Sequence, residues 1–439
     1  MLFKAIFTNS SGILLSRLLG FVRDLLMASI LGANIYSDIF FVAFKLPNLF
    51  RRVFAEGAFT QAFIPAYAKS RQKVRFSTLI FTQFMAFLLL LSLIVSLFAH
   101  YITKAIAIGF DDATIDLAAP LVAINFYYLP LIFIVTFLAA LLQYKHHFAT
   151  TAFATALLNI AMITALLISN GMSKYDIVYY LSYGVLAGGV LQVIVHIIAL
   201  KRKNLFKAFA FKSKVLKKDA QNSKFYKKFI PAVFGSSTSH ISAFLDTWLA
   251  SFLVTGSISY LYYANRVFQL PLALFAIATS IALFPMVAKN IKNKNEHLAL
   301  IHLRKAFFAL LAVLSIAMII GLVFSNQIVW LLFERGAFSS TDTQNTALVL
   351  SMYLIGLLPY GLAKIFSLWL YANEKQIIAA KIAAKSLGFN IIFSLILIIP
   401  YEAAGLALAS TLSGFVLFYL TIKEFGYNKF LQLIKIGDK

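Results

Sequence analysis

Long apolar runs recur along the whole chain, and they constrain its fold more than any other feature. Examples are residues 81–99, 311–324 and 391–400. Of the 439 residues, 61% are hydrophobic and only 13% are charged, and the mean hydropathy is +0.86. One soluble core cannot bury so many runs, whereas a bilayer needs roughly 20 apolar residues per helical span. The sequence therefore predicts an all-α polytopic membrane protein.

We predict twelve transmembrane helices from the positions of these runs. Several are longer than one crossing requires, so tilted or kinked helices are expected. The predicted spans are about 11–33, 38–68, 76–100, 116–142, 150–170, 177–200, 226–255, 258–289, 304–325, 343–372, 377–399 and 401–423.

Positive charge is concentrated in alternate loops. The formal net charge is +23, and Lys and Arg cluster at 69–75, 201–228 and 289–305, whereas the intervening loops hold acids such as Asp111 and Asp176. The positive-inside rule then places the basic loops and both termini in the cytoplasm. We expect the stretch 201–228 to lie on anionic lipid rather than on nucleic acid.

Three motifs recur about 220 residues apart. Phe44-Lys45-Leu46-Pro47 returns as Phe268-Gln269-Leu270-Pro271, and Asp24 with Ala28-Ser29 returns as Asp246 with Ala250-Ser251. The third pair is 62–69 with 282–289. This repeat predicts two six-helix lobes related by a pseudo-two-fold axis along the membrane normal, with a substrate cavity between them. The expected parts are an N-lobe at 1–200, a basic linker at 201–225 and a C-lobe at 226–439.

Charged and polar residues interrupt the first two predicted spans. A charge at membrane depth costs at least ~2.5–3.5 kcal/mol, so such residues usually line a wet cavity or pair with one another. On the second span, spacings of three, four and seven put most of them on one helical stripe. The residues are Arg17, Arg23, Asp24, Asp38, Lys45, Asn48, Arg51, Arg52 and Glu56.

A surplus of positive charge in these spans indicates an anionic cargo. Arg266 on the eighth span and Lys364 on the tenth add to it. A guanidinium presents a planar fork that binds phosphate bidentately, so converging arginines suit a pyrophosphate. The open alternative is that Asp24, Asp38 and Glu56 neutralise the arginines in salt bridges that only join helices.

The chain shows no sign of an active site. It has no cysteine, which excludes disulfides and thiolate metal sites. No catalytic carboxylate pair or P-loop is evident, so we expect neither an enzyme nor direct use of ATP. Asp246 is an acid on the seventh span that either binds a coupling cation or pairs internally. Membrane potential, with or without a monovalent cation, is the expected driving force.

Two strings carry a family resemblance. The run Ser16-Arg17-Leu18-Leu19-Gly20-Phe21-Val22-Arg23-Asp24 and the run 38–59, which contains Phe44-Lys45-Leu46-Pro47-Asn48-Leu49-Phe50-Arg51-Arg52, resemble the MurJ/MviN family of bacterial lipid II flippases. Tyr262-Tyr263-Ala264-Asn265-Arg266 and Glu334-Arg335-Gly336-Ala337-Phe338 match later signatures of that family. The resemblance covers essentially the full length.

The resemblance implies a member of the superfamily that includes multidrug exporters and polysaccharide flippases. The family carries undecaprenyl-pyrophosphoryl disaccharide-pentapeptide to the outer leaflet for peptidoglycan synthesis. Its essential cavity arginines match Arg17, Arg23, Arg51 and Arg266, and its acidic positions match Asp24 and Asp38. Two departures stand out: Asn265 replaces a frequent Asp, and the sequence ends soon after the twelfth span, where the family usually has two further helices that line a groove for the lipid tail.

The leading hypothesis is a lipid II flippase that works by alternating access. Its partners would be lipid II and membrane lipids, with cell-wall synthesis proteins as a further candidate class. The alternative is an exporter of another polyprenyl-linked glycan, or of drugs, on the same fold. The predicted substrate-binding residues are Arg17, Arg23, Asp24, Asp38, Lys45, Asn48, Arg51, Arg52, Glu56 and Arg266, and Ser16 is expected to complete the polar lining.

Overall fold

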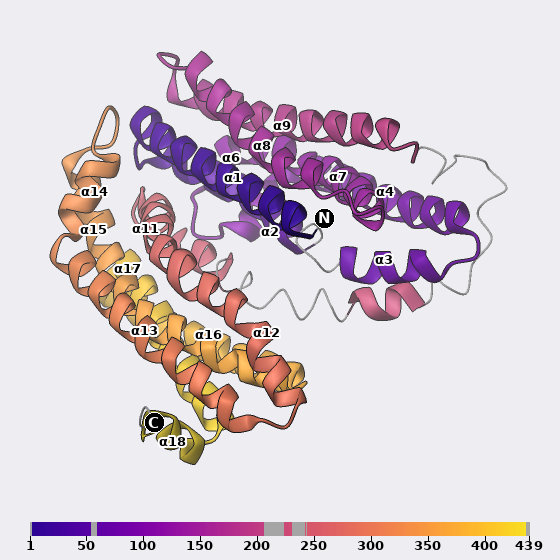
Figure 1. Ribbon diagram of the computed structural model, residues 1–439. Helices are drawn as coiled ribbons and strands as arrows, with labels where there is room; N and C mark the ends of the chain where they lie inside the picture. The colour runs from indigo at the N-terminus through magenta and orange to yellow at the C-terminus, as the bar shows by residue number, and fades with distance from the viewer. Residues whose placement is uncertain (1, 54–58, 206–223, 231–241, 243, 436–439) are drawn as a thin grey trace. The chain divides into compact units, whose positions relative to one another are not determined.

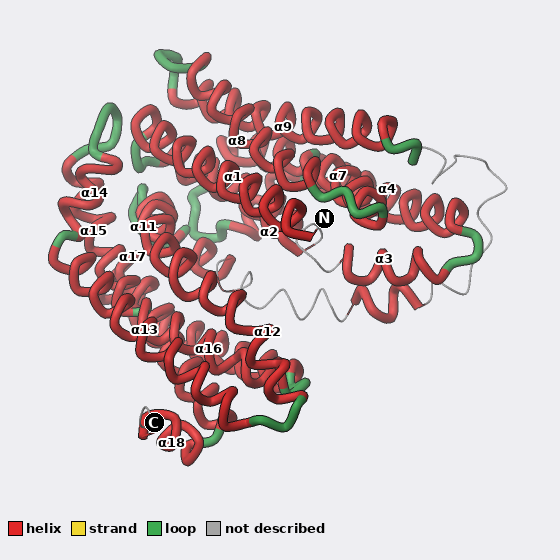
Figure 2. Tube along the Cα trace, viewed as in Figure 1, coloured by secondary structure: helices red, strands yellow, loops and turns green. Residues whose placement is uncertain are grey.

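The computed structural model describes residues 2–53, 59–205, 224–230, 242 and 244–435, with side chains of 2–10 and 52–53 left out. Every regular element in these ranges is helical (Figures 1 and 2), which confirms the predicted all-α fold. The chain divides into two compact units, Met1–His240 and Ile241–Lys439. They are called unit 1 and unit 2 below.

Among its described residues, unit 1 has nine labelled helices and a short helix at 224–230. The labelled helices are α1 (Leu2–Leu31), α2 (Ile35–Val53), α3 (Phe59–Lys69), α4 (Lys73–Leu97), α5 (Ala99–Ile106), α6 (Asp112–Phe126), α7 (Tyr128–Tyr144), α8 (Ala149–Ile168) and α9 (Lys174–Arg202).

Unit 2 begins with a short helix at 244–250. The labelled helices are α11 (Ser257–Pro271), the π-helical η4 (Leu272–Ile277), α12 (Ala278–Lys292), α13 (Glu296–Val323), α14 (Ser325–Phe333), α15 (Ser340–Ile355), α16 (Leu357–Ala372), α17 (Gln376–Phe425) and α18 (Tyr427–Lys435).

The turn between α1 and α2 shows how local sequence ends one helix and begins the next. Gly32 has a φ of 76°, a left-handed conformation that glycine adopts without a steric penalty after a helix. The Oδ1 of Asn34 accepts a hydrogen bond from the backbone N–H of Tyr36 at 2.9 Å. The Ser37 hydroxyl donates to the Asn34 carbonyl at 2.8 Å. This closed turn sets the start of α2, three residues before the predicted start of the second span.

Acidic and hydroxyl residues in the loops cap several helices. Asp111 accepts a hydrogen bond from the backbone N–H of Thr114 at 2.9 Å at the start of α6. The side-chain and backbone hydrogen bonds with Thr114 lower the pKa of Asp111. Ser339 and Asp342 form a reciprocal capping box at the start of α15. Acids in these loops therefore accept hydrogen bonds from backbone N–H groups at helix N-termini. They also follow the predicted alternation of basic and acidic loops.

The eleventh and twelfth predicted spans form a helical hairpin within α17. The helix breaks at Glu402, where φ is 48° and ψ is −128°, two residues after Pro400. The Ser386 hydroxyl donates to the Ser413 carbonyl at 2.8 Å, so the two arms run antiparallel. At Gly405 a Cβ atom would lie 2.1 Å from the Leu397 carbonyl oxygen, and glycine is required for this approach. The predicted break near residue 400 is confirmed.

Several helices expose broad apolar surfaces. In α13 only 22% of the most apolar 18 residues are buried. On α4 the exposed fraction of Phe87 is 56% and that of Leu97 is 70%. Apolar surface of this extent is stable in lipid and not in water. By length and composition, eight helical segments of the described chain can cross a membrane; the total of twelve and the pseudo-two-fold axis stay predictions.

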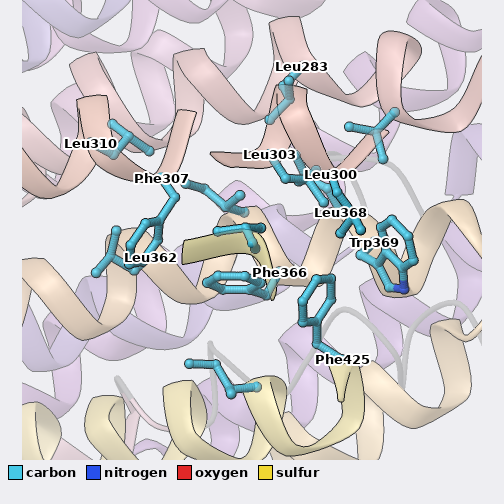
Figure 3. Packing of buried hydrophobic residues seen from close by; sticks show 14 of the residues in the cluster. Leu283, Leu300, Leu303, Phe307, Leu310, Leu362, Phe366, Leu368, Trp369 and Phe425 are labelled. Atoms are coloured by element: carbon cyan, nitrogen blue, oxygen red, sulfur yellow. The ribbon is translucent and has the colours of Figure 1, made fainter. Parts of the chain in front are cut away.

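The core of unit 2 draws buried side chains from η4, α12, α13, α16, α17 and α18. Figure 3 shows Phe307 of α13, Phe366 and Trp369 of α16, and Phe425 of α17 packed together. The amphipathic α18 caps this cluster, because its Phe430 lies 5.5 Å from the ring of Phe366. In lipid, close packing contributes more to the association of helices than the transfer of apolar groups from water does.

An aromatic cluster in unit 1 includes the end of the predicted linker. Phe225 contacts the rings of Phe59 of α3 and Phe84 of α4, with centroids 5.8 and 6.0 Å apart. The Tyr226 hydroxyl donates to Gln83 Oε1 at 2.9 Å. Figure 1 shows the helix 224–230 beside α3. These contacts join the helix 224–230 to α3 and α4. The predicted boundaries of the N-lobe, linker and C-lobe stay a prediction.

Candidate functional site

An ion pair on α1 is buried against α8. Arg23 is 6% exposed and Asp24 is 1% exposed. Arg23 donates to Asp24 Oδ1 from Nε at 3.0 Å and from Nη2 at 2.6 Å. A buried guanidinium is stable only with such hydrogen-bonded compensation. The structure places the guanidinium of Arg23 between α1 and α8. Its predicted role in a cavity that binds an anionic cargo stays a prediction.

A second partner holds Arg23 from the other helix. Its Nη1 donates to Asn159 Oδ1 at 3.0 Å, and Asn159 lies on α8, 136 residues further along the chain. Asn159 Nδ2 in turn donates to the backbone carbonyl of Ser16 at 2.9 Å. One amide therefore joins two predicted site residues of α1.

The polar stripe of α2 is described only in part. Asp38 is 2% exposed, and Lys45, Asn48 and Arg51 are half-buried. Arg51 donates from Nε and Nη2 to Asn48 Oδ1 at 3.2 and 3.1 Å, which holds the guanidinium along its own helix. The side chain of Arg52, and all of Glu56, lie outside the described residues.

Aromatic contacts fix α2 within unit 1. Phe44 packs on Tyr128 of α7 with ring centroids 6.3 Å apart. Phe50 packs edge-on against Phe126 of α6 at 6.1 Å. Thus α2 packs along α6 and α7, whereas α1 packs along α8. Arg17, which we also predicted in the site, is exposed on α1.

Arg266 in unit 2 is held by an aromatic residue of its own helix. The guanidinium carbon lies 5.1 Å from the ring centroid of Tyr262, and Nη2 donates to the Tyr262 hydroxyl at 2.9 Å. Phe268 stacks on Tyr353 of α15 at 5.5 Å and fixes the rotation of α11. Arg266 is half-buried.

Asp246 lies at one end of a chain of hydrogen-bonded hydroxyl and amide groups. Its Oδ2 accepts from the Ser410 hydroxyl at 3.5 Å, the outer limit of a hydrogen bond. Ser410 Oγ accepts from Asn390 Nδ2 at 3.2 Å, and Asn390 Oδ1 accepts from Ser242 at 3.3 Å. The helix 244–250 is thereby tied to both arms of α17.

The structure brings some predicted residues together and adds two that sequence reasoning missed. Arg23 contacts Asp24, and Arg51 contacts Asn48. Asn159 and Asn390 were not predicted as site residues. A signal was present, because each is an amide in an otherwise apolar span, and polar groups at membrane depth are usually functional. The central cationic cavity between the lobes stays a prediction.

The sequence profile named "Lipid II flippase MurJ" matches residues 27–436 of this chain. The chain belongs to the MurJ family. The resemblance seen in the sequence motifs is therefore confirmed. This family consists of multi-pass transporters of the bacterial inner membrane and is not a family of catalytic enzymes.

Curated MurJ relatives align along most of the chain. The "Probable lipid II flippase MurJ" of Helicobacter pylori (strain ATCC 700392 / 26695) is 52% identical over 423 residues, which cover 93% of this chain and 92% of that protein. The corresponding protein of Haemophilus influenzae (strain ATCC 51907 / DSM 11121 / KW20 / Rd) is 34% identical over 429 residues, 93% of this chain and 83% of its own length.

Solved structures show the same fold. A structure named "Lipid II flippase MurJ, inward closed conformation" matches with a TM-score of 0.83 and 25% identity, covering 98% of this chain and 93% of that one. An inward-facing multidrug resistance MATE transporter matches with a TM-score of 0.77 and 11% identity, over 99% of this chain and 100% of the other. This second likeness concerns the fold alone and agrees with the superfamily expected from the MurJ motifs.

Proposed function

We propose that this chain flips lipid II from the cytoplasmic to the outer leaflet for peptidoglycan synthesis, by alternating access. The family match over 27–436 is the observation that carries the proposal. The cargo would be undecaprenyl-pyrophosphoryl disaccharide-pentapeptide, translocated without covalent change. The protein would be a multi-pass inner-membrane protein with both termini in the cytoplasm, and cell-wall synthesis proteins remain candidate partners.

Oriented arginines support an anionic cargo. Arg51 is held by Asn48, and Arg266 is held by Tyr262, each from its own helix. A guanidinium with a fixed plane loses less rotamer freedom when it binds a phosphate. These residues, with Arg17 and Arg23, would bind the pyrophosphate. Asp24, Asp38, Lys45, Asn48, Arg52 and Glu56 would complete or orient the polar surface.

We further propose that Asp246 binds a monovalent coupling cation. The carboxylate, the Ser410 hydroxyl and the Asn390 amide are oxygen-bearing groups within one hydrogen-bonded chain. Hard cations prefer carboxylate, carbonyl and hydroxyl oxygens, so the donor set fits. Membrane potential would contribute as well, because one charge moved across 100 mV changes the free energy by roughly 2.3 kcal/mol.

Depletion in the native host tests the flippase assignment. The chromosomal copy would be placed under control of a repressible promoter, and the orientation of lipid II across the two leaflets would be measured after depletion. We expect lipid II to accumulate in the inner leaflet and outward orientation to return with the plasmid-borne chain. Normal outward orientation without the protein would refute the assignment. Accumulation of a different polyprenyl-linked glycan would favour the alternative exporter.

A further inference from the structure

We propose that Asn159 is a positioning residue, which fixes the guanidinium of Arg23 for binding of the pyrophosphate. The inference rests on the proposed function, because it takes the cargo to be a pyrophosphate-linked lipid. Asn159 is 7% exposed and lies on α8. It would act through Arg23 and would not itself bind the cargo.

Two contacts on different edges set the plane of the Arg23 guanidinium. Asp24 accepts from Nε and Nη2, whereas Asn159 accepts from Nη1. Asp24 is the next residue on the same helix, so it moves with Arg23 whenever α1 moves. Asn159 belongs to another helix, α8, from which the sulfur of Met162 also lies 3.6 Å from Nη1. A thioether sulfur is a weak acceptor, so the amide oxygen of Asn159 is the stronger of these two contacts that fix the guanidinium relative to α8.

The amide of Asn159 is itself oriented. Its Nδ2 donates to the Ser16 carbonyl at 2.9 Å, so that Oδ1 is directed to Arg23. The backbone beside it is also fixed, because a Cβ atom at Gly188 of α9 would lie 2.8 Å from the Cα of Leu158. The acceptor for Arg23 is thus held by side-chain and backbone contacts on two neighbouring helices.

The competing explanation is that Asn159 only joins two helices. Unit 1 contains a matched case in Asn125, which is 0% exposed. Its Nδ2 donates to the Ser182 hydroxyl at 2.8 Å and so joins α6 to α9. A purely structural role predicts equal consequences for the two asparagines. A positioning role predicts that Asn159 alone affects the binding of an anion.

Binding measurements on the purified full chain in lipid nanodiscs distinguish the two roles. The probes would be undecaprenyl pyrophosphate and uncharged undecaprenol, tested with Asn159→Ala, Asn125→Ala, Arg23→Ala and the double variant Asn159→Ala/Arg23→Ala. We expect Asn159→Ala to weaken pyrophosphate binding about tenfold, as for a lost hydrogen bond to a charged group. Undecaprenol binding should not change, and Asn125→Ala should bind both probes as the unmodified protein does.

The double variant tests whether Asn159 acts through Arg23. It should bind the pyrophosphate as weakly as Arg23→Ala alone, because the positioned group is gone. If Asn159→Ala fails to accumulate, Asn159→Leu replaces it, since leucine fills the same space and removes both hydrogen bonds.

Three results would overturn the positioning role. They are unchanged pyrophosphate affinity in Asn159→Ala or Asn159→Leu, an equal loss in Asn125→Ala, and additive losses in the double variant. An unmodified protein that does not bind the pyrophosphate lipid would overturn the positioning role together with the pyrophosphate cargo. Normal binding with no effect of depletion on lipid II orientation would refute only the flippase assignment.

Discussion

Asp24 and Asp246 occupy corresponding positions in the predicted repeat, yet their surroundings differ. Asp24 is 1% exposed and its Oδ1 lies 2.6 Å from the guanidinium of Arg23. Asp246 is half-buried and accepts from the neutral hydroxyl of Ser410 at 3.5 Å. Each unit also has an asparagine beside its acid, in the fifth predicted span of that half. In unit 1, Asn159 contacts the arginine that pairs with Asp24, and in unit 2, Asn390 contacts Ser410.

The two acids have different hydrogen-bond partners, and under the proposed function they would therefore have different roles. In unit 1 the acid compensates an arginine, so the carboxylate stabilises a cationic side chain that suits an anionic cargo. In unit 2 the acid is joined to hydroxyl and amide groups, whose oxygens suit a bound cation. The predictions below test each half of this comparison, in order of decreasing effect.

Arg23 and Arg266 should be indispensable. Arg23→Ala and Arg266→Ala each remove a charge-assisted phosphate contact, and we expect both to abolish growth as the only copy while the proteins still accumulate. Arg→Lys should fail as well at bidentate positions, because an ammonium lacks the planar fork. Growth curves and immunoblots of membranes are the measurements.

Arg75→Ala is the matched control for the arginine variants. Arg75 is a half-buried arginine near the start of α4, where it donates to Gln72 of its own segment, and its loss should leave growth unchanged. If Arg23→Ala and Arg266→Ala both support normal growth, the assignment of these arginines to the pyrophosphate is wrong.

Asp24 should matter more for stability than its repeat counterpart. Asp24→Asn removes the carboxylate from a buried ion pair, and we expect a loss of about 3–5 kcal/mol in the free energy of unfolding. Denaturant titration in bicelles measures this quantity. The control, Asp112→Asn, affects an exposed pair with Lys104 whose atoms are 2.9 Å apart, and solvent screening should make its effect small. Equal losses in the two variants would contradict the compensating role of Asp24.

Asp246 should confer cation-dependent stability. A cation at 100 times its dissociation constant would stabilise the folded protein by about 2.7 kcal/mol. We expect the melting temperature to rise with sodium or potassium chloride relative to choline chloride, and Asp246→Asn to remove that rise. Because Asp24 contacts an arginine, Asp24→Asn should lower the melting temperature and retain the cation response. A cation response that survives Asp246→Asn would exclude this residue as the site.

The cap of α6 should produce the smallest effect, and it should depend on pH. Thr114 lowers the pKa of Asp111 from 3.8, so the stabilisation is present above the unfolded pKa and is lost as pH falls through the folded pKa. The difference in melting temperature between the unmodified chain and Asp111→Ala should be constant near neutral pH and shrink in acid. Asn295→Ala removes a cap that does not titrate, and its difference should not shrink; parallel behaviour of both variants would refute the titration.

The helical membrane fold could be predicted from the amino-acid sequence. In lipid, backbone groups must be satisfied within the segment, so long apolar runs form helices, and Pro400 near the end of such a run marks the hairpin in α17. The motifs at 16–24 and 38–59 also indicated the family, because strings of this length do not match a family's motifs by chance.

The contacts of the charged side chains could not be predicted from the sequence, because they depend on how the helices pack. The stripe on α2 could be inferred from its spacing, but the direction in which Arg23 points depends on how α1 rotates against α8, and Asn159 is 136 residues away. Likewise, the aromatic side chains of 224–230 joined that segment to unit 1, although its charge pattern resembles a linker. Periodicity identifies the face of one helix, whereas the partner of that face follows from packing between helices that are distant in the chain.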